Sequence, residues 1–335
     1  MFGYEANEYD VKVYNEEIKD FVPDKIIDAH VHVYKQDFRL RVSTKWTAKV
    51  ATECPYEDLN QTFADMFPGK KLKAVMMTMP NYDLDKGNEY IEECIGKGAT
   101  GLYCTRYNTT PAEIEDAILN KGFVGIKPYI CNGPAYIPIN EIRIFDFLPH
   151  EHLKVMDSLG GIVLLHIGRD QRLKDPLNIA QLMEIEEKYP NLKLIVAHIG
   201  RAYSPEDLGN AFETLKHTKN MMFDFCATTF TDAMVECLKA VGPKRLMYGT
   251  DMPITKMRMR RISENGIYKN VIPKGLYGDV SDDIHMIETE GEDLTCFVYE
   301  EIRAFKRAAQ LLKLTKEDIN DVFYGNASRL FGMEF

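Results

Sequence analysis

The chain has 335 residues, 45% of them hydrophobic and 27% charged, as in ordinary soluble globular proteins, so a disordered chain is excluded. Its 51 acidic and 41 basic residues give a net charge of −10, which argues against a general nucleic-acid or anionic-membrane binder. We find no signal-peptide pattern, no run of about 18 apolar residues and no CxxC pair among the seven cysteines. We therefore expect a cytoplasmic protein that binds no membrane.

Short apolar runs alternate with amphipathic stretches along the chain, which is typical of βα units and a parallel sheet. Eight such units in series predict an α/β protein with a distorted (β/α)8 TIM barrel, expected as a single domain over 1–335 with its core at about 24–333. An open doubly wound sheet is the alternative, but no GxGxxG follows the first strand. The predicted strands are 25–33, 72–79, 101–107, 123–130, 162–168, 193–200, 221–228 and 245–253, and predicted helices include 111–122, 175–191, 204–220 and 231–244.

Three segments depart from this repeat, namely 34–56, 131–150 and 254–292. Each follows a predicted strand. We therefore expect all three to be loop insertions at the C-terminal face of the barrel, where active sites lie.

Polar side chains occur at four predicted strand ends. His30 and His32 end the first strand, and their i, i+2 spacing places both imidazoles on one side. His166, His198 and Asp251 end the fifth, sixth and eighth strands. A lone strand-end histidine is more often structural, but five such residues at one end of a barrel converge, and imidazoles with a carboxylate suit a catalytic divalent metal.

The motifs DAHVH, LLHIG, VAHIG, YGTDMP and YGNASRLFG occur in this order. With them the chain resembles the amidohydrolase superfamily, and within it amidohydrolase family 2, which includes aminocarboxymuconate-semialdehyde decarboxylase-like enzymes. The resemblance implies one divalent metal, usually Zn²⁺, with Mn²⁺ as an alternative. It implies His30, His32, His166 and Asp251 as metal ligands and His198 as the histidine that polarises substrate or orients water.

These residue types suggest roles in catalysis. Asp251 is our candidate general base, and His198 can transfer a proton or stabilise negative charge. A fifth metal ligand or a structural support is the alternative for His198.

Three cations near strand ends are candidate substrate ligands. Lys127, near the end of the fourth strand, is assigned to the site but not to the metal. An ammonium that binds a substrate carboxylate, a salt bridge to a neighbouring acid and a carbamylated lysine that bridges two metals, as in related barrels, are all consistent with it. Arg169 and Arg201 end two identical HIGR segments, and guanidinium groups suit bidentate recognition of a carboxylate. Pairing with helix-start acids such as Asp170 or Asp207 is their alternative.

Five further residues are expected to have structural, solvent-exposed or lid positions. Asp28 is expected to support the neighbouring histidines, and His217 and His285 are expected to face solvent. Arg41 and Trp46, in the first long loop, are candidates for a lid over the site.

The leading interpretation is a metal-dependent hydrolase that activates water for attack on a small carboxylated amide, ester or lactone. The alternative is a metal-dependent non-oxidative decarboxylase of a small aromatic or unsaturated acid, and a barrel retained for binding is a third. A small-molecule substrate and no nucleic acid are expected. A homodimer is expected only from the resemblance, since dimers are common among the relatives.

Overall fold

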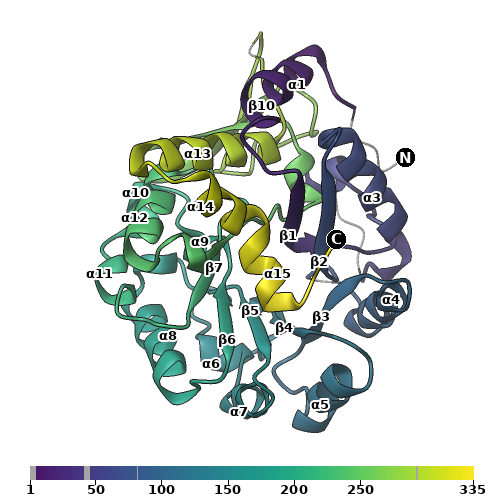
Figure 1. The fold of residues 1–335 in the computed structure, drawn as a ribbon, viewed down its shortest axis with the longest axis vertical. Helices are drawn as coiled ribbons and strands as arrows, with labels where there is room; N and C mark the ends of the chain where they lie inside the picture. Colours follow the sequence, from purple (N-terminus) through teal and green to yellow (C-terminus); the bar gives the residue numbers. More distant parts are fainter. Residues whose placement is uncertain (1–4, 41–45, 81, 292) are drawn as a thin grey trace.

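In a computed structural model of the protein (Figure 1), residues 5–40, 46–80, 82–291 and 293–335 are described. Eight parallel strands pair in chain order from β1 to β8. The sheet closes on itself because the Ala29 N–H donates to the Tyr248 carbonyl (3.0 Å) and the His32 N–H to the Met252 carbonyl (2.8 Å). The predicted (β/α)8 barrel is confirmed. The strands are β1 (Lys25–His32), β2 (Lys71–Met77), β3 (Thr100–Thr105), β4 (Gly125–Pro128), β5 (Ile162–Leu165), β6 (Lys193–Val196), β7 (Met222–Asp224) and β8 (Leu246–Met247).

Helices connect the strands and surround the barrel, and several begin at caps that the sequence encodes. The helix over Pro111–Leu119 starts with a capping box between Thr110 and Glu113, and Asp175 caps the helix over Pro176–Lys188. The predicted helix over 204–220 is two short helices separated at Gly209. The helices are α1 (Glu8–Val13), α2 (Thr47–Val50), α3 (Tyr56–Met66), α4 (Leu84–Gly96), α5 (Pro111–Leu119), α6 (Ile144–Phe147), α7 (His150–Ser158), α8 (Pro176–Lys188), α9 (His198–Arg201), α10 (Pro205–Leu208), α11 (Phe212–Leu215), α12 (Thr231–Val241), α13 (Phe297–Leu312), α14 (Lys316–Asn320) and α15 (Asn326–Phe331).

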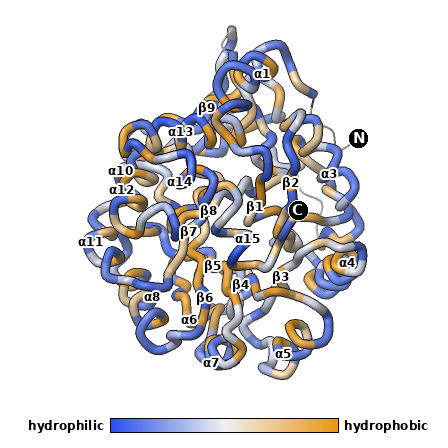
Figure 2. The backbone as a smooth tube through the Cα atoms, viewed as in Figure 1, coloured by the Kyte–Doolittle hydropathy of each residue, from blue (hydrophilic) through white to orange (hydrophobic). Residues whose placement is uncertain are grey.

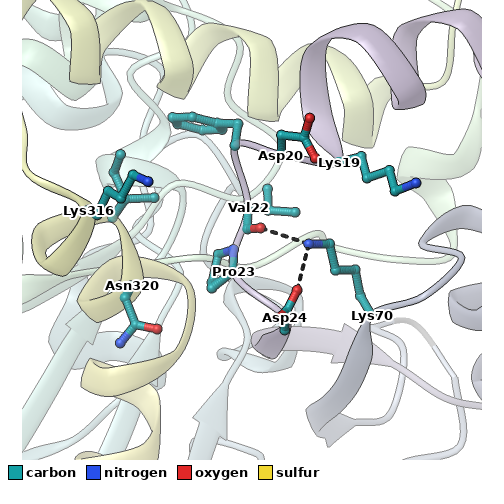
Figure 3. A pocket seen from close by; sticks show the side chains of 10 residues that line it. Lys19, Asp20, Val22, Pro23, Asp24, Lys70, Lys316 and Asn320 are labelled. Carbon is teal, nitrogen blue, oxygen red and sulfur yellow. Dashed lines mark hydrogen bonds and ion pairs between the residues drawn. The ribbon is translucent and has the colours of Figure 1, made fainter.

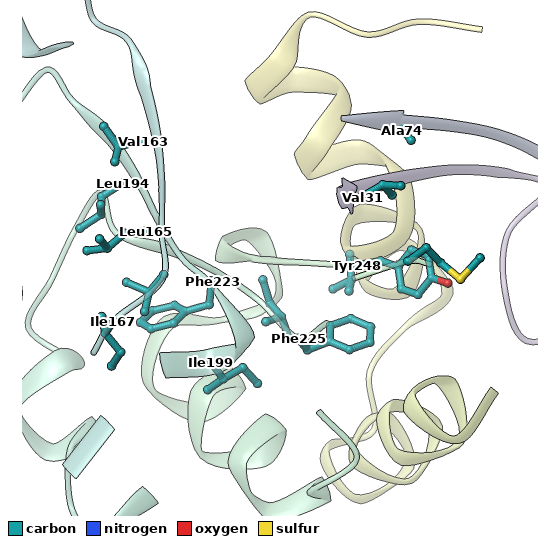
Figure 4. Packing of buried hydrophobic residues seen from close by; sticks show 14 of the residues in the cluster. Val31, Ala74, Val163, Leu165, Ile167, Leu194, Ile199, Phe223, Phe225 and Tyr248 are labelled. Atoms are coloured by element: carbon teal, nitrogen blue, oxygen red, sulfur yellow. The ribbon is translucent and has the colours of Figure 1, made fainter. Parts of the chain in front are cut away.

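Alternate residues of the strands face two apolar cores. Outward residues such as Val163, Leu165 and Phe223 pack beneath the helices (Figure 4). Inward residues, among them Leu164 and Ile195, fill the barrel together with residues of α15 and the chain end. The central strands are accordingly hydrophobic along their length, whereas the surrounding helices are hydrophobic on one side only (Figure 2).

A β-bulge interrupts β1 just before the paired histidines. Asp28 pairs with Ala74 of β2 and Val31 with Met76, so β1 holds one extra residue between these points. Before the bulge Ile27 belongs to the inner core, and within the bulge His30 contacts Lys127 from β4 inside the barrel. The bulge therefore turns the histidine pair into the mouth of the barrel.

The three predicted insertions differ in structure. The first contains α2, with Trp46 half-buried; Arg41 lies outside the described residues. The second contains α6. The third forms a small three-stranded sheet that the sequence analysis did not predict, made of β9 (Arg260–Glu264), β10 (Ile267–Pro273) and β11 (Met286–Thr289). Among all described helices, none is long and apolar enough to cross a membrane.

Candidate metal centre

His30 is held from behind by an aspartate on β7. Its Nδ1 lies 3.0 Å from Asp224 Oδ2, and because a carboxylate oxygen only accepts, the Nδ1–H donates. Its Nε2 then presents a lone pair 3.2 Å from Lys127 Nζ and 3.7 Å from Asp251 Oδ1. Burial, and after it the charge of Lys127, lowers the pKa of His30 to about 3, so the ring is neutral.

His32 is oriented in the same way by a backbone carbonyl. Its Nδ1 lies 3.1 Å from the Thr78 carbonyl oxygen, which only accepts. The Tyr129 hydroxyl also donates to this carbonyl (2.7 Å). The Nε2 of His32 therefore carries a lone pair in the neutral ring, yet it lies 2.9 Å from Asp251 Oδ1. Two acceptors at this distance repel each other unless a proton or a metal cation lies between them.

His198 follows β6 and is fixed by β7. Its Nδ1 lies 3.0 Å from the Cys226 carbonyl, and its backbone N–H donates to Asp224 Oδ1 at 2.7 Å. Its ring centroid is 5.0 Å from those of His30 and His166. Burial lowers its pKa, so the neutral ring offers a lone pair at Nε2.

Asp251 follows β8 and is the carboxylate of the group, with a side chain 25% exposed. Burial acts to raise its pKa, but the contact with the His32 ring and the other adjacent histidines hold it well below the ordinary range. The donor atoms of His30, His32 and Asp251 lie within 4.8 Å of one another. The structure therefore brings together three of the four ligands that the resemblance implies.

The fourth expected ligand, His166, is half-buried beside this group. Burial, and after it the charge of Arg201, holds its pKa well below the ordinary value. Its Nδ1 is buried without a hydrogen-bond partner among the described residues. A metal ligand role for His166 stays a prediction, and an orphaned neutral imidazole agrees with it.

The donor set fits a divalent ion. Three histidines have Nδ1–H groups bound to oxygen acceptors, which leaves Nε2 for a metal, and such outer partners are the usual support of metal-binding histidines. Neutral imidazoles with one carboxylate suit zinc, and they also accept manganese.

Lys127 reaches the same space from β4 and is fully buried. Burial lowers the pKa of its ammonium group. His30 Nε2 lies 3.2 Å from its Nζ. Lys127 thus lies among the residues that are expected to bind the metal, and its role in substrate binding stays a prediction.

The two HIGR arginines differ in their surroundings. Arg169 donates to Asp175 Oδ2 at 2.8 Å and to the Glu141 carbonyl at 3.0 Å. Arg201 is half-buried and has no hydrogen-bond or ion-pair partner within 5–40, 46–80, 82–291 and 293–335. Arg169 is thus held by the protein, whereas Arg201 is open to a ligand.

Sequence reasoning missed Asp224 and Cys226, which link the histidines. Asp224 binds His30 and His198 and accepts from the Cys226 thiol at 2.9 Å. Although burial acts to raise it, the interaction with the adjacent His30 ring lowers the pKa of Asp224 to about 2. The signal was present: Asp224 and Cys226 are polar residues at i, i+2 in an apolar strand, the same spacing as the histidine pair. These residues form a second group with donor atoms of metal-binding type, but those atoms already bond one another.

Left-handed backbone conformations gather at the ends of these strands. Six non-glycine residues there have φ between 46° and 67°. Such conformations cost about 1–3 kcal/mol each and collect at functional sites. They are Arg169 after β5, His198, Ile199 and Arg201 after β6, Ala227 after β7 and Asp251 after β8.

A hollow of about 450 Å³ lies away from the histidines and is lined in part by Asp24 and Lys70. Figure 3 shows Lys70 bound to Asp24 and to the Val22 carbonyl within it. Asp24 and Lys70 directly precede β1 and β2, so this hollow is at the opposite end of the barrel from the histidines.

Comparisons with known proteins agree with this geometry. Residues 27–261 match the family model described as amidohydrolase. A search of the curated proteins finds no match.

Several solved structures share the fold. A probable 2-pyrone-4,6-dicarboxylic acid hydrolase from Acinetobacter baumannii, with citric acid bound, is 17% identical, with a TM-score of 0.56 over 92% of this chain and 99% of that chain. A zinc-bound amidohydrolase from Burkholderia multivorans is 12% identical, with a TM-score of 0.60 over 92% and 99%. A dihydroxybenzoic acid decarboxylase from a Polaromonas species, with manganese and the inhibitor 2-nitroresorcinol, is 12% identical, with a TM-score of 0.58 over 92% and 97%.

Proposed function

Because the chain belongs to the amidohydrolase family, we propose that it is a hydrolase that uses one bound divalent metal, zinc or alternatively manganese, to hydrolyse a small carboxylated amide, ester or lactone. The two similar structures with zinc and manganese support the choice of metals. His30, His32, His166 and Asp251 would hold the ion.

One observation carries this proposal. His32 Nε2 and Asp251 Oδ1 lie 2.9 Å apart. The proton of the neutral His32 ring is at Nδ1, where it is donated in a hydrogen bond to the Thr78 carbonyl. His30 directs its Nε2 lone pair at the same carboxylate oxygen from 3.7 Å. A cation among these atoms removes the repulsion between them.

Asp251 would act as the general base. A bound divalent ion supplies Lewis-acid chemistry, polarising a carbonyl oxygen and making water a stronger acid. The carboxylate of Asp251 is ionised, since its pKa is held low, and one quarter of the side chain reaches solvent. It can therefore accept the proton that water loses as it attacks the carbonyl carbon.

His198 would move a second proton. Because its Nδ1–H is bound to the Cys226 carbonyl, Nε2 is the atom that exchanges protons. The neutral ring accepts a proton at Nε2; once protonated, it stabilises negative charge on the carbonyl oxygen or donates to the leaving group.

Substrate carboxylates would bind the cations at the mouth. Arg201 is the stronger candidate because its guanidinium has no partner within the described ranges. Lys127 is the second, from β4, and Arg169 would need to exchange its bond to Asp175 for one to substrate.

A decarboxylase is the second candidate. The dihydroxybenzoic acid decarboxylase shares the barrel, and a neutral His198 could protonate a ring carbon only after gaining a proton at Nε2. In that reaction His198 would act as the acid, and no water would be consumed.

The test begins with metal content measured by elemental analysis on protein purified without chelator. About one equivalent is expected. The loaded protein is then assayed with carboxylated lactones, esters and amides for acid release, and with hydroxybenzoates for carbon dioxide release. Acid release alone supports the hydrolase, and carbon dioxide release alone the decarboxylase. Full turnover after exhaustive chelation would contradict both.

A further inference from the structure

A second hollow adjoins the metal centre. It has a volume of about 280 Å³ and lies between the segments that follow β5 and β6 and the inserted sheet β9–β11. Tyr203 links the two places, with its ring centroid 6.2 Å from that of His198 and 5.3 Å from that of Tyr268, which lines the hollow. The lining residues are Asp170, Arg172, Arg201, Ser204, Asp207, Gly266, Ile267, Tyr268, Ile284 and His285.

Two arginines and two aspartates line this hollow, and one of the arginines has no ion-pair partner among the described residues. Arg172 is neutralised by Asp207, at 2.7 Å, and Ser204 also donates to that carboxylate. Asp170 is exposed. Arg201 is half-buried and, over the described ranges of the chain, has neither a carboxylate nor a hydrogen-bond acceptor as partner. A partly desolvated guanidinium without a partner favours an anionic ligand.

The outer wall is aromatic and rigid. The rings of Tyr268 and His285 stack at 4.0 Å with an angle of 7° between their planes. Arg172 and Arg261 lie over Tyr268, at 5.0 and 4.5 Å from the ring centroid. His285, expected to face solvent, is half-buried, because the inserted sheet places one side of its ring on Tyr268. A planar wall beside a cation suits a planar acid.

The inserted sheet is also tied to the first loop. Trp46 Nε1 donates to Asp283 Oδ2 at 3.0 Å. His285 Nδ1 lies 2.8 Å from the Tyr268 carbonyl, which fixes the ring and leaves Nε2 uncommitted. The wall is thus preorganised rather than dependent on ligand for its shape.

We propose that this hollow is a subsite for a second carboxylate of a planar diacid, bound by Arg201 against the Tyr268–His285 wall while the reacting group lies at the metal centre. The inference rests on the proposed function for the identity of the neighbouring centre. It makes the inserted sheet the element that selects diacids over monoacids.

The experiment compares two probes, benzoate and benzene-1,3-dicarboxylate, by titration calorimetry on the metal-loaded full chain. The diacid is expected to bind about tenfold tighter or more. Arg201→Gln should abolish this preference. Arg307→Gln, an exposed arginine on α13, should keep it.

Equal affinities in the wild type, or a preference that survives in the Arg201→Gln protein, would overturn the subsite. Circular dichroism and thermal unfolding check that the variant is folded, and Arg201→Lys, which keeps the charge but not the bidentate geometry, should retain part of the preference. Failure of the proposed function is seen separately, as absence of bound metal or of acid release, whereas the subsite is judged from the difference in affinity between the two probes.

Discussion

The two ends of the barrel are made of the same eight strands, but they differ in the burial and the contacts of their charged side chains. At the amino end, Lys70 pairs with Asp24; the carboxylate side chain is 92% exposed, although the lysine side chain is only 8% exposed. At the carboxyl end, Asp224 and Lys127 are fully buried, and each is aimed at a histidine. A charged side chain that stays hydrated can be substituted with little change in the free energy of unfolding, whereas a buried and oriented one cannot. Substitutions at the two ends should therefore differ sharply in effect.

The largest contrast is expected from removing a metal ligand. His32→Ala should lose the metal and lower turnover by about 10³-fold or more, because both metal binding and the position of Asp251 depend on that ring. Lys70→Ala, at the other end, should change neither. Elemental analysis and steady-state assays measure both. Full metal occupancy in the His32→Ala protein would contradict the ligand assignment.

A smaller effect on metal binding is expected from a substitution of the aspartate that orients the histidine ligands. Asp224→Asn should weaken metal affinity by about 10- to 100-fold, because an amide at this position no longer orients His30 and His198 as a carboxylate does. Competition with a chelating dye measures the affinity, and Asp24→Asn is the matched control. Equal affinities in these two variants would show that Asp224 has only a packing role.

The third contrast concerns stability and pH. Glu301 on α13 is fully buried, neither of its carboxyl oxygens has a hydrogen-bond partner among the described residues, and burial raises its pKa well above the ordinary 4.5. The folded state therefore holds a proton that the unfolded state releases above about pH 4.5, so stability falls as pH rises from there.

Glu301→Gln removes this penalty, and the variant should gain stability relative to the wild type between pH 5 and pH 8. Urea unfolding at both pH values measures the gain. Glu317→Gln, exposed on α14, should show no comparable change. A variant that is less stable than the wild type by the same amount at both pH values would refute the protonated state.

The smallest effect is expected near the amino-end hollow. Lys313 is exposed and ends α13 with φ of 54°, a left-handed conformation that glycine adopts without strain. Lys313→Gly should raise the free energy of unfolding by about 0.5–1 kcal/mol, with activity unchanged. Chemical denaturation measures the gain, and a loss of stability would show that the lysine side chain contributes more than its backbone costs.

Much of the site could be predicted because its signals are local. The spacing of His30 and His32 fixes a common side within one strand, and strand-end positions place His198 and Asp251 at the same end of the barrel. Family membership, inferred from short motifs, is confirmed over residues 27–261.

Other features depended on contacts between distant segments. Arg169 and Arg201 occupy identical tetrapeptides, but only Arg169 meets a carboxylate, because Asp175 lies at the start of α8. Asp224 gains its role from two histidines on other strands. The inserted sheet was missed because β9 and β11 are short and partly exposed, and because β10, although longer, shows little hydrophobic alternation.

The sequence by itself determined the barrel and the residue types at its mouth, since the apolar runs, the amphipathic stretches between them and their order are properties of the chain. Only the tertiary structure decided which way those side chains face and which charges remain free. The bulge in β1 turns His30 and His32 inward, burial keeps the His30 and His198 rings neutral, and the inserted sheet stacks His285 on Tyr268 beside the unpartnered Arg201. The burial of a side chain and its hydrogen-bond and ion-pair partners depend on segments far apart in sequence, so no local pattern encodes them.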